Sequence, residues 1–89
     1  MNYGTVKIIL EKAISSPAEV ELTELDEAIR WLEEKGTIRR LDRGADRDAY
    51  SSQFDAAAVE MRVLRRQLAN GEYGGATASA QRVLTLLGS

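Results

Sequence analysis

The sequence predicts an all-α protein, a compact bundle of about four short amphipathic helices that forms one single domain over residues 1–89. Two observations lead to this fold class. Apolar residues recur with steps of three and four in several segments, which is the period of an α-helix with one buried face. The chain is 44% hydrophobic and 29% charged with one proline, a composition typical of folded helical proteins. Short connections predict that consecutive helices pack antiparallel.

The first helix is expected over residues 2–14, with Asn2 as its N-cap. Its apolar stripe consists of Tyr3, Val6, Ile9, Leu10, Ala13 and Ile14. A short strand over residues 5–10 is the competing interpretation, because a brief apolar run suits either structure.

The second helix is expected from Pro17 to Lys35. Ser16 and Glu19 have the spacing of a capping box, and Pro17 suits the first helical position. The seam is formed by Ala18, Leu22, Leu25, Ile29 and Leu32. Gly36 is expected to end this helix, because glycine readily adopts the left-handed conformation of a helix stop.

Residues 37–49 are expected to form an exposed connector, since four arginines alternate there with aspartates and no helical period is present. A short strand over residues 37–41 is left open. The aspartates Asp42, Asp46 and Asp48 lack the glycine and the closing glutamate of a calcium loop, so no metal site is expected.

The third helix is expected to begin at Ser52, another capping-box start, and to end at Asn70-Gly71. Phe54, Ala57, Met61, Leu64 and Leu68 form its seam, which Tyr50 extends backwards. The glycines between residues 71 and 75 predict a turn or frayed segment. The final helix is then expected over residues 76–87.

Composition excludes several function classes. The chain has no cysteine and no histidine, so disulfides, thiolate and imidazole metal sites and the usual neutral-pH general base are absent. No enzyme activity and no cofactor are therefore expected. No leader segment and no membrane-length apolar run is present, which predicts a cytoplasmic protein that does not enter a membrane.

Charge is unevenly distributed along the chain. Residues 1–36 hold eight acids and four bases, whereas residues 37–89 hold six acids and eight bases. Such complementary halves favour association within or between chains.

These features favour a small protein-protein interaction or assembly module that binds a protein partner or itself, as a homo-oligomer, through apolar helix faces. The expected core residues are Leu22, Leu25, Ile29, Leu32, Phe54, Met61, Leu64 and Leu68. Trp31, Tyr50 and Tyr73 are the candidate partner-binding residues, because aromatic side chains beside a core stripe often anchor interfaces. The alternative for Trp31 is that it widens the core face.

The alternative function is nucleic-acid binding. Residues 25–40, from Leu25 to Arg40, resemble the end of the recognition helix and the first wing strand of winged-helix DNA-binding domains. The resemblance implies a helix in the major groove and wing arginines on the DNA backbone. Arg39, Arg40 and Arg43 are the candidate nucleic-acid residues.

A fainter resemblance concerns the C-terminal part of the chain. Gly71, Tyr73 and Ala76 are similar to the turn and second-helix start of a tetratricopeptide repeat. This resemblance implies a helical hairpin that contacts protein.

Overall fold

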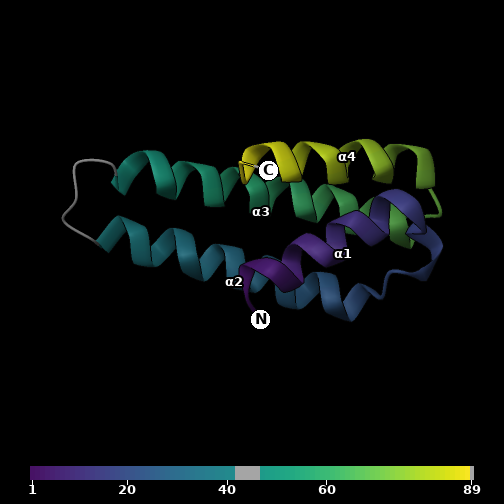
Figure 1. Ribbon diagram of the computed structural model, residues 1–89, viewed down its shortest axis with the longest axis horizontal. Coiled ribbons are helices and arrows are strands. Elements are labelled where there is room, and N and C mark those ends of the chain that lie inside the picture. The colour runs from purple at the N-terminus through teal and green to yellow at the C-terminus, as the bar shows by residue number, and fades with distance from the viewer. Residues whose placement is uncertain (42–46, 89) are drawn as a thin grey trace.

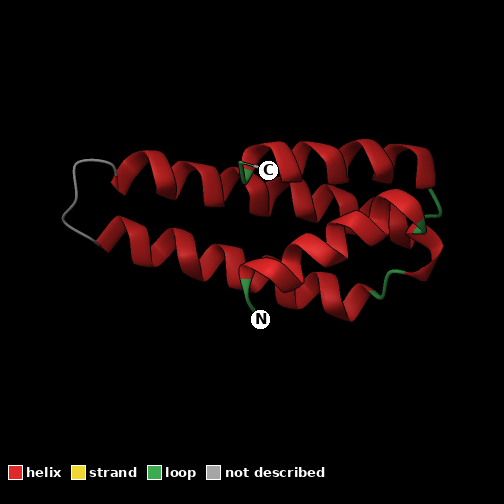
Figure 2. Cartoon of the chain, viewed as in Figure 1, coloured by secondary structure: helices red, strands yellow, loops and turns green. Residues whose placement is uncertain are grey.

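The computed structural model describes residues 1–41 and 47–88, and the side chains of residues 1–36 and 53–88. The described residues contain four α-helices and one short 3₁₀ helix, without a strand (Figures 1 and 2). The elements are α1 (Tyr3–Ser15), η1 (Pro17–Glu19), α2 (Leu22–Leu41), α3 (Arg47–Ala69) and α4 (Tyr73–Leu86). The predicted all-α bundle is confirmed.

The helices form an elongated bundle with extents of 41 × 20 × 20 Å. Helices α2 and α3 form a long antiparallel hairpin, and α4 returns along α3 (Figure 1). Helix α1 packs mainly on α4 and touches α2 only slightly. The predicted antiparallel packing of consecutive helices therefore holds for α2 with α3 and for α3 with α4, but not for α1 with α2. The far ends of α2 and α3 extend beyond α1 and α4 (Figure 1).

The core contains most of the residues that the helical seams predict. Leu25, Leu32, Met61 and Leu64 are fully buried, and Ile29 and Leu68 are nearly so. Leu22 and Phe54 are partly buried and pack against this cluster. Helices α1 and α4 complete the core with Val6, Ile9, Leu10, Ala13, Ala76, Ala80 and Val83.

Helix α1 begins as the sequence predicts. The Asn2 side-chain Oδ1 accepts a hydrogen bond from the Thr5 backbone N–H at 2.8 Å, which satisfies one of the free N–H groups of the first turn. Residues 5–10 are helical, so the alternative strand is wrong.

Replacing Asn2 by Ala is expected to lower the free energy of unfolding by about 1 kcal/mol, because this capping bond is lost. Urea unfolding followed by circular dichroism would measure it. Asn2→Asp, which keeps an acceptor oxygen, serves as the control and should cost much less. An equal loss in both variants would contradict the capping role.

The predicted start of the second helix is wrong. Pro17 opens the three-residue η1 helix, and α2 begins only at Leu22. The Ser16 side chain makes no capping bond, so the capping box with Glu19 is not formed. The chain bends at Val20, which is buried and has an extended backbone.

Gly36 does not end α2, which continues to Leu41. A Cβ atom at residue 36 would lie 2.5 Å from the Asp55 Oδ1 and 3.7 Å from the Phe54 Cβ. The missing side chain thus permits close approach of α2 and α3. Gly36 is a packing residue and not a helix stop.

The prediction of an exposed connector over residues 37–49 is also wrong at both ends of that range. Residues 37–41 continue α2 and residues 47–49 begin α3, so residues 37–41 form no strand. Helix α3 begins at Arg47, earlier than the predicted Ser52. Residues 42–46, the remaining part of the expected connector, lie outside the described residues. They include Asp42 and Asp46, two of the three aspartates for which a calcium loop was considered and not expected.

The turn between α3 and α4 is confirmed at Asn70-Gly71. Gly71 has φ +74°, and the Glu72 N–H donates to the Gln67 carbonyl at 2.8 Å. This is the Schellman arrangement that ends many helices.

Helix α4 begins at Tyr73, three residues before the predicted start. Gly74 and Gly75 lie in its first turn and do not form the frayed segment that was expected. A Cβ atom at Gly75 would lie 2.7 Å from the Gln67 Nε2. Gly75 therefore leaves room for the Gln67 amide, whose Oε1 accepts a bond from the buried Ser79 hydroxyl at 2.7 Å.

Candidate interaction surfaces

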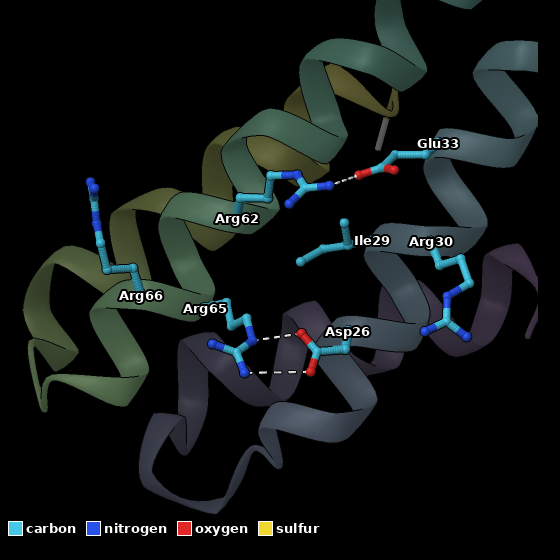
Figure 3. A pocket seen from close by; sticks show the side chains of 7 residues that line it. All are labelled: Asp26, Ile29, Arg30, Glu33, Arg62, Arg65 and Arg66. Carbon is cyan, nitrogen blue, oxygen red and sulfur yellow. Dashed lines mark hydrogen bonds and ion pairs between the residues drawn. The ribbon is translucent and has the colours of Figure 1, made fainter.

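A charged groove of about 530 Å³ lies between α2 and α3 (Figure 3). Its floor is the side chain of Ile29, which is nearly buried. The charged lining residues are Asp26, Arg30 and Glu33 of α2 and Arg62, Arg65 and Arg66 of α3.

Two ion pairs cross this groove. Arg65 donates from Nε to the Asp26 Oδ1 at 2.5 Å and from Nη2 to Oδ2 at 3.4 Å, and Arg62 pairs with Glu33. Each carboxylate that lines the groove is thus engaged by an arginine (Figure 3). These ion pairs link α2 to α3. The groove therefore does not offer a ligand a set of free hydrogen-bond donors that point to one place.

Arg30 and Arg66 lie at opposite margins of the charged groove. Neither makes a hydrogen bond or ion pair within the described part of the chain. The Arg66 side chain points away from the groove (Figure 3). These two arginines therefore do not converge on one anion.

A second groove lies between α1 and α2, where these helices touch only slightly. It consists of two adjoining hollows of about 330 and 240 Å³ that share Met1 and Glu27 in their linings. We call it the α1–α2 groove. Its apolar residues are Met1, Ile8, Ile9 and Trp31, and its charged residues are Lys12, Glu24, Glu27, Arg30 and Glu34.

Two of the apolar residues of this groove are unusually accessible. Ile8 is 65% exposed and Met1 is 44% exposed, although both are large apolar side chains. Trp31 is partly buried against the core, and the Lys35 Nζ lies 5.5 Å from the centre of its ring. Such a cation-π contact shields one face of the indole. The exposed apolar surface is therefore centred on Ile8 and Met1, with Trp31 at its end.

The predicted partner-binding residues do not form one site. Trp31 lines the α1–α2 groove, whereas Tyr73 is 43% exposed in the first turn of α4 and lines neither of its hollows. The Tyr50 side chain lies outside the described residues. The partner-binding residues predicted from the sequence did not include Ile8, Met1 or the glutamates of the groove. Ile8 is a large apolar residue that lies off the buried stripe of α1, and this position could have identified it as exposed.

The predicted nucleic-acid residues lack the wing on which that prediction depended. Arg39 and Arg40 lie in the helical continuation of α2, so the predicted wing strand is wrong. Their side chains, and Arg43 altogether, lie outside the described residues. The helical hairpin implied by Gly71, Tyr73 and Ala76 is present as α3 and α4.

Two further kinds of site are absent from the described residues. No cluster of three or more acidic, histidine or cysteine side chains is placed to hold a metal ion there. None of the helices in residues 1–41 and 47–88 combines the length and apolar character needed to cross a membrane.

Comparison with protein-family models, with curated proteins and with solved structures found no match to this chain.

Proposed function

We propose that this protein is a small helical protein-protein interaction or assembly module that associates with itself through apolar helix faces. The observation that supports this proposal is the exposure of Ile8 and Met1 beside Trp31 in the α1–α2 groove. Apolar side chains gathered on a surface and bordered by charged residues are typical of protein interaction sites. The proposed role is not catalytic, needs no cofactor, and belongs in the cytoplasm, in keeping with a cysteine-free composition.

Self-association would bury apolar side chains that a single copy of the chain leaves exposed to water. An 89-residue chain buries only a modest core, and its α1 helix uses its buried face on α4. Fully burying one large aliphatic side chain contributes about 1.5–3 kcal/mol. Covering Ile8 and Met1 would therefore contribute to the stability of an assembly without rearranging the bundle.

DNA binding is not favoured as the function. The helical course of residues 37–41 removes the wing strand. The α2 helix also carries glutamates on its exposed side, which would repel phosphate groups.

Replacing Ile8 by Ser is expected to weaken self-association by about tenfold or more, because the apolar contribution of one exposed side chain is removed. Light scattering after size exclusion, over a range of protein concentrations and at low and high salt, would measure the mass. Lys7→Ser, at an exposed neighbouring position outside the groove lining, is the matched control and should leave the mass unchanged.

Circular dichroism of the Ile8→Ser variant should show an intact fold, since Ile8 is mostly exposed. A wild-type protein that stays monomeric at every concentration would overturn the proposed function. An assembly that Ile8→Ser leaves unchanged would remove the α1–α2 groove from it.

A further inference from the structure

The two walls of the α1–α2 groove carry charges of opposite sign. We call the lining residues within residues 1–12 the α1 wall and those of α2 the α2 wall. Among the described residues, the α1 wall has no acid, and its charged groups are the Lys12 side chain and the α-ammonium group of Met1. The α2 wall has three acids and one base, which are Glu24, Glu27, Glu34 and Arg30. The groove as a whole is balanced, but its α1 wall is positive and its α2 wall is negative.

These charged side chains do not pair across the groove within one copy. Helices α1 and α2 touch only slightly there. Within the described part of the chain, no side-chain hydrogen bond or ion pair involves Lys12, Glu24, Glu27, Arg30 or Glu34. Since neither wall neutralises the other, each can attract a wall of opposite charge on a second molecule.

The charged groups also match in their order along the groove. Lys12 and Glu24 line only the first of the two hollows, and Trp31 lines only the second. Met1 and Glu27 line both hollows, so they lie where the two join. Each basic group of the α1 wall is therefore level with an acid of the α2 wall.

A surface with this arrangement is complementary to itself under one particular two-fold rotation. When two copies face each other about an axis parallel to the groove, the α1 wall of each copy lies over the α2 wall of the other, at the same position along the groove. Opposite charges then meet twice. An axis across the groove would place each wall over its own equivalent, and like charges would face each other. The charges therefore favour the first axis.

We propose that two copies of this chain form a dimer in which their α1–α2 grooves face each other about an axis parallel to the grooves. Lys12 of each copy approaches Glu24 and Glu27 of the other copy. The exposed Ile8 and Met1 of both copies are covered between these two rows of charges. This inference rests on the proposed self-association and specifies its symmetry. Because both copies use the same surface, the assembly closes at two copies.

Charge reversal on either wall tests this arrangement. Lys12→Glu and Glu27→Lys are each expected to weaken dimerisation by about tenfold or more, because each places like charges opposite one another twice in the dimer. Light scattering after size exclusion, over a range of protein concentrations, would measure the loss.

Mixing the two variants in equal amounts is expected to restore a dimer at wild-type concentrations. In the mixed dimer, the introduced acid of one copy faces the introduced base of the other, and the second contact is that of the wild type. Dimers of identical variants remain repulsive. The mixture therefore distinguishes a contact between the two walls from a general effect of charge.

The controls make the same changes of charge outside the groove. Lys7→Glu and Glu11→Lys lie at exposed positions of α1 that do not line either hollow, and neither is expected to change the mass. Circular dichroism and thermal unfolding would show that each variant is folded. Lys12 is half-buried. If Lys12→Glu does not fold, Lys12→Gln removes the charge at similar size and is expected to weaken the dimer several-fold.

The possible results separate this inference from the proposed function. A wild-type protein that is monomeric at every concentration overturns both of them. A dimer that withstands both reversals, or a mixture of folded variants that stays dissociated, overturns the facing grooves and leaves self-association standing. An assembly that grows beyond two copies as the concentration rises overturns the two-fold contact in the same way.

Discussion

Replacing Leu64 by Ala is expected to lower the free energy of unfolding by about 2–5 kcal/mol, the largest effect of any truncation considered for this protein. Leu64 is fully buried on α3, the helix that packs against both α2 and α4. The truncation removes apolar contacts and leaves a cavity that the long hairpin of α2 and α3 cannot easily close. Since small domains are stabilised by about 5–15 kcal/mol in total, a substantial fraction of the stability would be lost.

Chemical denaturation at a protein concentration low enough to exclude association would measure this loss. Val59→Ala is the matched control, because it truncates an exposed apolar side chain on the same helix. We expect it to change stability by about 0.5 kcal/mol or less. Equal effects of the two truncations would mean that Leu64 does not lie in the core.

Replacing Gly36 by Leu is expected to lower the free energy of unfolding by about 1–3 kcal/mol, because a side chain at residue 36 would force α2 away from α3. A Cβ atom there already comes within 2.5 Å of the Asp55 Oδ1. The loss would be measured by the same denaturation experiment.

A double-mutant cycle separates this packing constraint from helix propensity. Alanine at residue 36 favours the helix by about 1 kcal/mol over glycine, but its Cβ meets Asp55. Gly36→Ala should therefore be more favourable in an Asp55→Ala background than in the wild type. Additive effects of the two substitutions would show that the Asp55 carboxylate is not the obstacle.

The helical period was enough to predict the fold class and most of the core. Leu25, Ile29, Leu32, Met61, Leu64 and Leu68 are buried as their spacing indicates, because burial of one helix face is a local property of the sequence. The boundaries were predicted less well. Gly36 and Gly75 read as helix breakers, yet both lie in helices where a side chain of another helix comes too close for a Cβ atom.

The α1–α2 groove could not be predicted from spacing, because it depends on which helix α1 packs against. The connection from α1 to α2 is short, which favoured packing between these two helices. The structure instead places α1 on α4, where the Tyr3 hydroxyl donates to the Leu87 carbonyl at 2.6 Å. That hydrogen bond joins residues 84 positions apart in the sequence, and the packing of α1 on α4 leaves Ile8 and Trp31 at an open groove.

The packing of α1 on α4 also determines the order in which the bundle can be completed during synthesis. The ribosome makes α1 first and its main packing partner last, whereas α2 and α3 are neighbours that can pair as soon as both have emerged. Until α4 is released, the apolar stripe of Val6, Ile9, Leu10 and Ala13 has no permanent cover. The nascent chain therefore exposes this apolar stripe until α4 has emerged, and the bundle can close only after that point.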